Sequence, residues 1–594
     1  MSPELSLDDT LRRVRGSGFG HRLLSQARSL SRRFLVLTLI AVGAMCGVLA
    51  VAFERYVEWT RELLIGRALA LHEPWRTIFV IATPTILFTL IAWVIRRFAP
   101  RAVGANLARV RMAYNNDPAL LSKRSIAATF IATPLSLGAG APLGPEGPIV
   151  VVTSGFSAAV ARLLRLPKKL VRGMIPVGVA AGIAAVFNTP ITGVVFALEE
   201  VFGAADRGLL GGVLVGAVAA AVVEKALLGG RPLLAAPLSA WTDTRELIGF
   251  ALVGIIAGAV SGLAIFVAHR LKRAWAAAMP SLLLRAALSG LLIGAAGLLS
   301  PSILGVGYDS VSYWLHGGGT IRSTAVAFAV KTVAFVIAIS GGVLGGSFAP
   351  SLFIGTALGA AVGQTAHAIV PAVDPKAYAI LGMGAFFAGL LRSPIAAVLI
   401  VIELTRDYEL VVPLMLAVSL AVAVSRRISR FSIVEQQMID EGYVEGHEAA
   451  DPLAHVRAAD AMTPAALAIP GGSRIGDAVA IAGATHFRMY PVVDGEGKLT
   501  GVISRDALDN AVREGKSDAV VAEVMQQPNL VALADDDLLE VVERMRLNGV
   551  NRCPVLDGDV SQRVVGFLSP SDILRARLTS KRPLDDETGF ELFE

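Results

Sequence analysis

Glutamates inside apolar stretches are the residues of this sequence whose types and spacing could do chemistry. Glu146 stands in a Gly-Pro-Glu-Gly-Pro string, while Glu199, Glu200 and Glu403 end two long apolar runs. An ionisable residue at the centre of a membrane helix costs roughly 2.5–3.5 kcal/mol and marks a functional site by default. One such glutamate would more simply cap a helix, but several in a repeated frame indicate chemistry on protons or ions.

The apolar runs that carry these acids form a repeat. Residues 178–199 align with residues 382–403 at a single offset, which places Glu199 on Glu403. A turn containing glycine and proline precedes each copy. Apolar segments that are interrupted by Gly and Pro at matching positions of two halves are typical of transporters with a site between the halves. The sequence therefore predicts an ion carrier.

The two turns predict an anion site made of helix N-termini. In Gly144–Pro148 proline is favoured in the first helical turn, so Glu146 lies beside unpaired backbone N–H groups. A helix N-terminus presents those donors and about half a positive charge, which attracts anions. The turn Gly346–Pro350 repeats the arrangement without a carboxylate. If the two ends face each other, an anion binds without lysine or arginine, and Glu146 competes for its position.

The composition places these segments in a membrane. The 594 residues are 54% hydrophobic and 17% charged, with a mean hydropathy of +0.62, which excludes a soluble protein of this size. Basic residues flank the apolar runs instead of forming a basic face, so we expect no nucleic-acid partner. Two cysteines and scattered histidines predict neither a disulfide framework nor a metal site.

The flanking charges set the expected topology. Residues 1–33 are rich in arginine and precede an apolar run of spanning length, and Arg426, Arg427 and Arg430 follow the last run. The positive-inside rule places both ends in the cytoplasm, with an even number of crossings. The apolar stretches between residues 124 and 200 contain Pro134, Pro142, Pro148, Pro176 and Pro190, which predict broken helices whose free backbone groups line a cavity.

The membrane segments resemble the CLC family of chloride channels and chloride/proton antiporters over about residues 34–440. Gly144–Pro148 matches the segment of the family's gating glutamate, with Pro145 in place of a basic residue, and Gly346–Pro350 matches a chloride-binding segment. The resemblance implies a gating role for Glu146. It also implies that the anion is bound by Gly144, Gly147, Gly346, Ser347, Phe348 and Ala349.

The string Phe196–Glu200 is similar to the family's inner proton site. The resemblance implies that Glu200 is the inner proton acceptor and that Glu199 beside it belongs to the proton pathway. Channels of the family commonly carry a neutral residue at the position of Glu200, so this carboxylate favours an antiporter.

Two departures from the family pattern put chloride preference in doubt. Gly104-Ala105-Asn106 stands where the family has a serine that touches the central anion, and Val434 stands where it has a tyrosine. Asn106 supplies an amide donor instead, or no side chain does. We expect anion binding to survive, with a weaker or shifted preference among chloride, nitrate and fluoride.

After about residue 430 a second kind of unit occurs twice. Each copy holds a helix-period stretch and then a Pro-Val-x-Asp-Gly string, which predicts a short buried strand and a turn. The pair resembles tandem CBS domains, which often hold adenine nucleotides. The resemblance places Ser569 and Asp572 on the ribose, whereas Ser504 and Asp506 in the first copy are one residue too close. A dimerisation module without nucleotide stays open.

The interpretation is an all-α polytopic membrane domain of two inverted-topology repeats with broken helices, plus a cytoplasmic α/β tandem CBS domain. The expected parts are a basic segment 1–33, a membrane domain 34–430, a linker 431–452, CBS domains 453–515 and 516–580, and a tail 581–594. We expect a homodimer in the cell membrane that needs no cofactor, is no enzyme, and exchanges chloride or another small anion for protons. A passive anion channel and a nucleotide-sensing membrane protein without transport are the alternatives.

Overall fold

The computed structural model describes most of the chain and divides it into two compact units. The described residues are 18–99, 106–115, 118–202, 210–230, 233–234, 236, 241, 245–441, 453, 456–464, 468–483, 487–558 and 561–579. Unit 1 comprises Met1–Tyr443 and unit 2 comprises Val444–Glu594.

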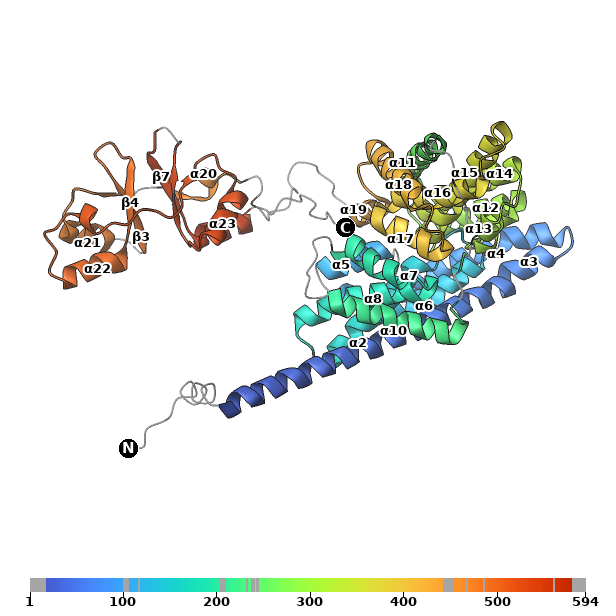
Figure 1. Ribbon diagram of the computed structural model, residues 1–594, viewed down its shortest axis with the longest axis horizontal. Coiled ribbons are helices and arrows are strands. Elements are labelled where there is room, and N and C mark those ends of the chain that lie inside the picture. The colour runs from blue at the N-terminus through green and yellow to red at the C-terminus, as the bar shows by residue number, and fades with distance from the viewer. Residues whose placement is uncertain are drawn as a thin grey trace. The chain divides into compact units, whose positions relative to one another are not determined.

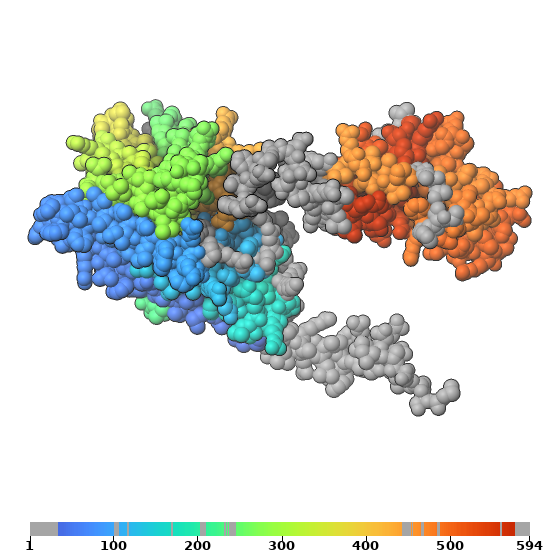
Figure 2. Space-filling view, turned by 180° about the vertical axis from the view of Figure 1, so that it is seen from behind, coloured from blue at the N-terminus to red at the C-terminus, as the bar shows by residue number. Residues whose placement is uncertain are grey.

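Unit 1 is built of helices. Its first half contains α2 (Gly18–Arg61), α3 (Arg67–Ala70), α4 (Trp75–Phe98), α5 (Leu107–Asn115), α6 (Lys123–Gly138), α7 (Glu146–Leu163), α8 (Lys168–Phe187), α9 (Pro190–Ala197) and α10 (Leu210–Leu228). Its second half contains α11 (Glu246–Ala278), α12 (Leu282–Leu299), α13 (Tyr308–Leu315), α14 (Ile321–Gly341), α15 (Phe348–Ile369), α16 (Pro375–Leu391), α17 (Pro394–Thr405), α18 (Val411–Ile428) and α19 (Ile433–Asp440). The two halves lie against each other, blue to teal and green to orange in Figures 1 and 2.

Many of these helices suit a membrane. Within the part of the chain that the structure describes, nine helices are long and apolar enough to cross one. α16 and α17 are apolar but shorter. Apolar side chains from the helices of both halves pack into one large core. Helix α2 begins at Gly18, inside the expected N-terminal segment 1–33. Helix α19 lies inside the expected linker 431–452.

The repeated prolines break the helices at matching places. Pro190 and Pro394 begin α9 and α17, and the residues that end the preceding helices, Asn188 and Arg392, adopt the left-handed conformation with φ of 53° and 68°. Pro134 and Pro176 differ from the expectation, because they lie inside the continuous helices α6 and α8. The Thr60 hydroxyl, on the neighbouring helix α2, donates to the Pro134 carbonyl at 2.8 Å.

Unit 2 is an α/β pair of similar halves. Its first half contains α20 (Ala458–Ala461), β1 (Thr463–Pro464), β2 (Ile469–Pro470), α21 (Ile475–Gly483), β3 (Met489–Val493), β4 (Leu499–Ser504) and α22 (Arg505–Arg513). Its second half contains β5 (Ala532–Leu533), α23 (Leu538–Leu547), β6 (Cys553–Leu556), β7 (Val564–Leu568) and α24 (Pro570–Thr579). The sheets have the orders β2-β3-β4 and β1-β7-β6-β5.

The halves of unit 2 exchange their first segments. β1 of the first half pairs antiparallel with β7 of the second, and Gln526 of the second half bridges to Val502 in β4. The exchange needs glycine at the two contact points. A Cβ atom on Gly566 would lie 2.9 Å from the Thr463 carbonyl oxygen, and one on Gly501 would lie 2.9 Å from the Gln526 carbonyl oxygen. Glycine at these two positions therefore allows the backbones of the two halves to approach each other closely.

Candidate functional site

The two predicted helix ends meet at the centre of unit 1. The Gly144 N–H donates to the Gly346 carbonyl at 2.9 Å, and the Gly346 N–H donates back to the Gly144 carbonyl at 2.6 Å. α7 begins two residues after Gly144 and α15 begins two residues after Gly346. This bridge therefore brings the N-termini of α7 and α15 together. A Cβ on Gly147 would approach the Gly346 Cα to 3.1 Å, so this contact also favours glycine.

The carboxylate of Glu146 lies between these helix ends and is fully buried. One oxygen accepts a hydrogen bond from the Ala349 N–H at 3.3 Å, in the first turn of α15, and the other accepts one from the Tyr308 hydroxyl. The carboxylate of one repeat thus accepts a hydrogen bond from the N-terminus of a helix in the other repeat. A small anion bound at the same donor would have to displace it.

A cavity of about 20 Å³ remains beside this carboxylate, enough for about one water molecule. Gly346, Ser347, Phe348 and Val434 contribute to its wall. The Phe348 ring is fixed by neighbouring rings, with centroids 4.9 Å from Phe187, 5.6 Å from Phe196 and 4.5 Å from Phe387. These predicted residues and Glu146 therefore line one cavity.

The departures found in the sequence fall partly at this cavity. Gly104 and Ala105 lie outside the described residues. Asn106 lines the cavity, and its side-chain amide donates to the Gln437 side-chain oxygen at 2.7 Å. Gln437 belongs to α19, one turn beyond Val434. Sequence reasoning named Val434 and missed Gln437. The helical turn of α19 determines which side chain reaches Asn106, and the match to the family pattern does not contain this information.

Tyr308 and Lys331 are two further residues that the sequence reasoning missed. The Lys331 ammonium is buried in α14, where it donates to the carbonyls of Ile303 and Gly305 at 2.8 and 2.7 Å and lies 4.6 Å from the Phe353 ring centre. These carbonyls belong to the turn that leads into α13 and presents Tyr308. A lone lysine in an apolar run was the available signal.

Glu199 and Glu403 cap each other's helices. Glu199 accepts from the N–H groups of Ile395 and Ala396 at 3.0 and 2.8 Å, at the start of α17. Glu403 accepts from the Ile191 and Thr192 N–H groups at 3.2 and 2.7 Å, at the start of α9. Each carboxylate ends one repeat and satisfies orphan donors in the other.

Glu200 is placed differently from its neighbour. It lies in the π-helical turn η4 (Leu198–Phe202), which turns its side chain inward, and it is 3% exposed. One oxygen accepts from the Ser393 hydroxyl, and the other lies 3.9 Å from the Arg111 guanidinium. Glu200 is therefore a buried acid with one hydroxyl partner and a distant cation.

In unit 2 a cavity of about 220 Å³ lies between the exchanged halves. Ser569 and Asp572 line it, as do three arginines and three aromatic residues: Arg488, Arg552, Arg575, Phe487, Tyr490 and Phe567. Asp572 is 2% exposed. It accepts from the Thr463 hydroxyl at 2.8 Å, from the Ser569 N–H at 3.0 Å and from Arg575 at 2.7 Å.

Within the described residues no group of three or more His, Cys, Asp or Glu side chains could hold a metal ion. The groups at the centre of unit 1 include the Glu146 carboxylate, the Tyr308 hydroxyl and backbone amides. Amide N–H and hydroxyl groups can donate to an anion, and a carboxylate can carry a proton.

Comparisons with known proteins agree with this arrangement. The family model described as "Voltage gated chloride channel" matches residues 87–426, and the CBS domain model matches residues 458–514 and 521–579. A ClcB-like protein of Ralstonia nicotianae is 34% identical over 304 residues, which are 50% of this chain and 71% of that protein. An H(+)/Cl(-) exchange transporter ClcA of Klebsiella pneumoniae is 28% identical over 395 residues, 64% of this chain and 83% of that protein.

Solved structures share the fold. The crystal structure of a slow cyanobacterial Cl-/H+ antiporter superposes with a TM-score of 0.64 at 24% identity, covering 68% of this chain and 97% of that one. A eukaryotic CLC transporter superposes with a TM-score of 0.63 at 18% identity, covering 91% and 97%.

The two-repeat membrane fold and its buried carboxylates define a membrane transport protein rather than an enzyme. The chain belongs to the voltage gated chloride channel family, the CLC family, and carries a C-terminal pair of CBS domains. The predicted fold class and the resemblance are thereby confirmed.

Proposed function

We propose that this chain exchanges a small anion, with chloride as the first candidate, for protons across the cell membrane. The observation that carries the proposal is the buried Glu146 carboxylate, which accepts the Ala349 N–H at the start of α15. A charged carboxylate there competes with the anion for one donor. A protonated carboxylate loses the attraction of the helix N-terminus and can move away. Relatives named as H(+)/Cl(-) exchange transporters support the pairing of the two ions.

Glu200 is the inner proton acceptor in this proposal. Its burial and its single hydroxyl partner, Ser393, leave the charged form poorly solvated, so that it takes up a proton readily. Glu199, which the sequence placed on the same pathway, accepts two backbone N–H groups. We assign Glu199 to holding α17 in place and not to proton transfer.

The anion preference depends on amides in this proposal. The Asn106 and Gln437 side chains lie at the cavity of Glu146, where the resemblance leads one to expect a serine and a tyrosine. With amides in place of these hydroxyl donors, we expect weaker discrimination among chloride, nitrate and fluoride. Replacing chloride by each of these anions in a flux assay measures that preference.

In this proposal the protein is a homodimer in the cell membrane, with the N-terminus and the CBS pair in the cytoplasm. The arginine-rich segments at both ends of the membrane unit support this orientation. Ile191 and Ile395 are 58% and 59% exposed on α9 and α17, which supports an apolar contact between two copies at these repeats.

The CBS pair binds an adenine nucleotide in this proposal. The cavity of unit 2 combines arginines for phosphates, aromatic rings for a base and the Asp572 carboxylate. Asp572 already accepts hydrogen bonds from Thr463, Ser569 and Arg575, so a ribose hydroxyl would replace one of these donors.

The proposed exchange is tested by flux from the purified full chain in liposomes. A chloride gradient that drives proton uptake supports antiport. Chloride flux without protons favours the passive channel, and no anion flux at all favours the nucleotide-sensing membrane protein.

A further inference from the structure

A second, larger cavity adjoins the one at Glu146. Its volume is about 360 Å³, and it is bounded by α5, α11, α19 and the segment before α15. The two cavities share Asn106, Gly345 and Gln437 in their walls. The hydrogen-bonded Asn106 and Gln437 amides thus border both cavities. The larger cavity therefore lies on an approach to the Glu146 site.

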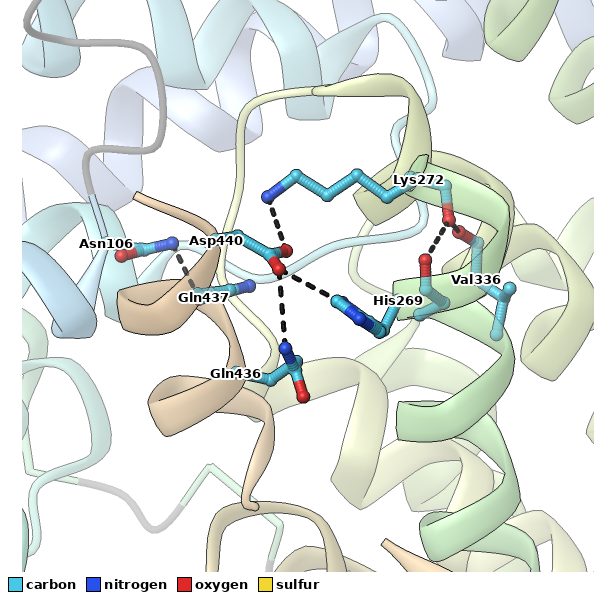
Figure 3. A network of polar contacts seen from close by, with 9 residues as sticks. Asn106, His269, Lys272, Val336, Gln436, Gln437 and Asp440 are labelled. Atoms are coloured by element: carbon cyan, nitrogen blue, oxygen red, sulfur yellow. Dashed lines mark hydrogen bonds and ion pairs between the residues drawn. The ribbon is translucent and has the colours of Figure 1, made fainter. Parts of the chain in front are cut away.

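One carboxylate in this cavity collects donors from two helices. Asp440, the last residue of α19, lies 2.8 Å from the Lys272 ammonium and 3.0 Å from the His269 Nδ1, both on α11 (Figure 3). The Gln436 amide donates to the same carboxylate at 3.3 Å. The Asp440 side chain is 11% exposed, so it is largely removed from water.

The end of α19 also pairs the third basic residue of this cavity. Arg109 on α5 lies 3.0 Å from the Glu441 carboxylate, the residue that follows α19. Arg109, His269 and Lys272 are the basic residues in the described wall, and all three face acids at the end of α19. Without those acids the wall would be cationic, and a cationic cleft concentrates anions.

We propose that His269 and Lys272 form a further site for the transported anion, which the Asp440 carboxylate occupies in this structure. The inference rests on the proposed anion transport. A carboxylate held by an ammonium, an imidazole and an amide stands where a small monovalent anion would find the same donors. An anion arriving from the α11 side displaces Asp440, and the amides of Asn106 and Gln437 separate it from the Glu146 cavity.

A pair of substitutions with a double-mutant cycle tests this site. Asp440→Asn removes the competing charge and should lower the chloride concentration for half-maximal flux by up to about fivefold, the size expected for a partly exposed ion pair. Lys272→Gln should raise that concentration. In the Lys272→Gln background, Asp440→Asn should have no further effect, because the site is already lost. Glu58→Gln, which removes an exposed charge on α2, is the matched control and should change nothing.

A second measurement separates this proposal from the proposed function. Calorimetry of bromide binding to the purified full chain should show one more bound ion for Asp440→Asn than for the Asp440→Asn, Lys272→Gln double variant, whether or not the protein transports. Asp440→Ser serves the same purpose if Asp440→Asn does not fold. Equal bromide binding by these two variants, or an unchanged chloride dependence of flux in Asp440→Asn, would overturn the site. Absence of anion flux in the wild type, with the extra bromide still bound, would overturn only the proposed transport.

Discussion

At the scale of residues, the hydrogen-bond donors around each carboxylate determine what that carboxylate can do. Glu199 and Glu200 are neighbours in sequence, yet the first accepts backbone amides and the second accepts a hydroxyl inside the protein. The π-helical turn η4 separates them. A carboxylate that satisfies helix donors is stabilised as an anion, whereas one with few donors is poised to take a proton.

Tyr308 is the residue whose role can be isolated most cleanly. Its hydroxyl donates to Glu146, so Tyr308→Phe removes a donor to a carboxylate without changing the shape of the ring. The Glu146 carboxylate should leave the α15 end more readily, and anion flux at neutral pH should rise by at most about tenfold, the equivalent of a ~1.4 kcal/mol hydrogen bond. Tyr313→Phe on the same helix is the control, because Tyr313 is 59% exposed. A flux in Tyr308→Phe equal to that of Tyr313→Phe would show that this hydroxyl does not hold Glu146.

At the scale of elements, the two repeats are tied together by the helix ends that they exchange. The Gly144 and Gly346 bridge joins α7 to α15, and Glu199 and Glu403 join α9 to α17. Short helices that begin at a proline have unpaired N–H groups, so an acid from the other repeat stabilises each start. The symmetry of the sequence is thus also a symmetry of contacts.

The capping role makes a prediction about stability. Glu403→Gln loses the charge that accepts the Ile191 and Thr192 N–H groups and should destabilise unit 1 by ~1–2 kcal/mol. The melting temperature of the purified protein in detergent should fall, while the ratio of protons to anions moved should stay unchanged. Glu409→Gln, at an exposed side chain near the end of α17, is the control. A changed ion ratio in Glu403→Gln would instead place this acid in the transport chemistry.

The sequence predicted these elements unevenly. The starts of α7 and α15 followed from Gly and Pro in the first turn, and their facing arrangement followed from the repeat. The inward turn of Glu200 did not, because a π-helical turn has no composition signal in five residues. Gln437 and Tyr308 were missed because their contacts join segments that are far apart in sequence, 331 and 162 residues from Asn106 and Glu146. A continuous α6 was missed because neighbouring helices decide whether a proline breaks a membrane helix.

At the scale of the whole molecule, α19 is the last helix of the first unit. It ends at Asp440, and the first unit ends at Tyr443. The acids that pair Arg109, His269 and Lys272 thus stand directly before the segment that leads to the CBS pair. A ligand of the CBS pair shifts transport only by its differential affinity for two states, typically about 1–3 kcal/mol, or severalfold or more in rate.

Nucleotide binding can be measured on the full chain. Calorimetry with ATP and AMP should show binding, and Asp572→Ala should weaken it about tenfold or more, as expected for the loss of a hydrogen bond to a charged group. Asp506→Ala, at the related position of the first CBS domain, should leave the affinity unchanged. Thermal melting of both variants checks that Asp572→Ala still folds without its bonds to Thr463 and Ser569. No binding by the wild type would leave the CBS pair as a dimerisation module.

The central claim is that one buried carboxylate serves both the anion and the proton, and one measurement tests it most directly. Liposomes that hold the purified full chain are given a steep outward chloride gradient and a smaller outward proton gradient, so that chloride leaving by exchange drives protons inward against their gradient, and proton and chloride movements are recorded together. The wild type should move protons uphill, Glu146→Gln and Glu200→Gln should pass chloride without moving protons, and Glu199→Gln should behave as the wild type. Uphill proton movement that persists in Glu146→Gln would contradict the account.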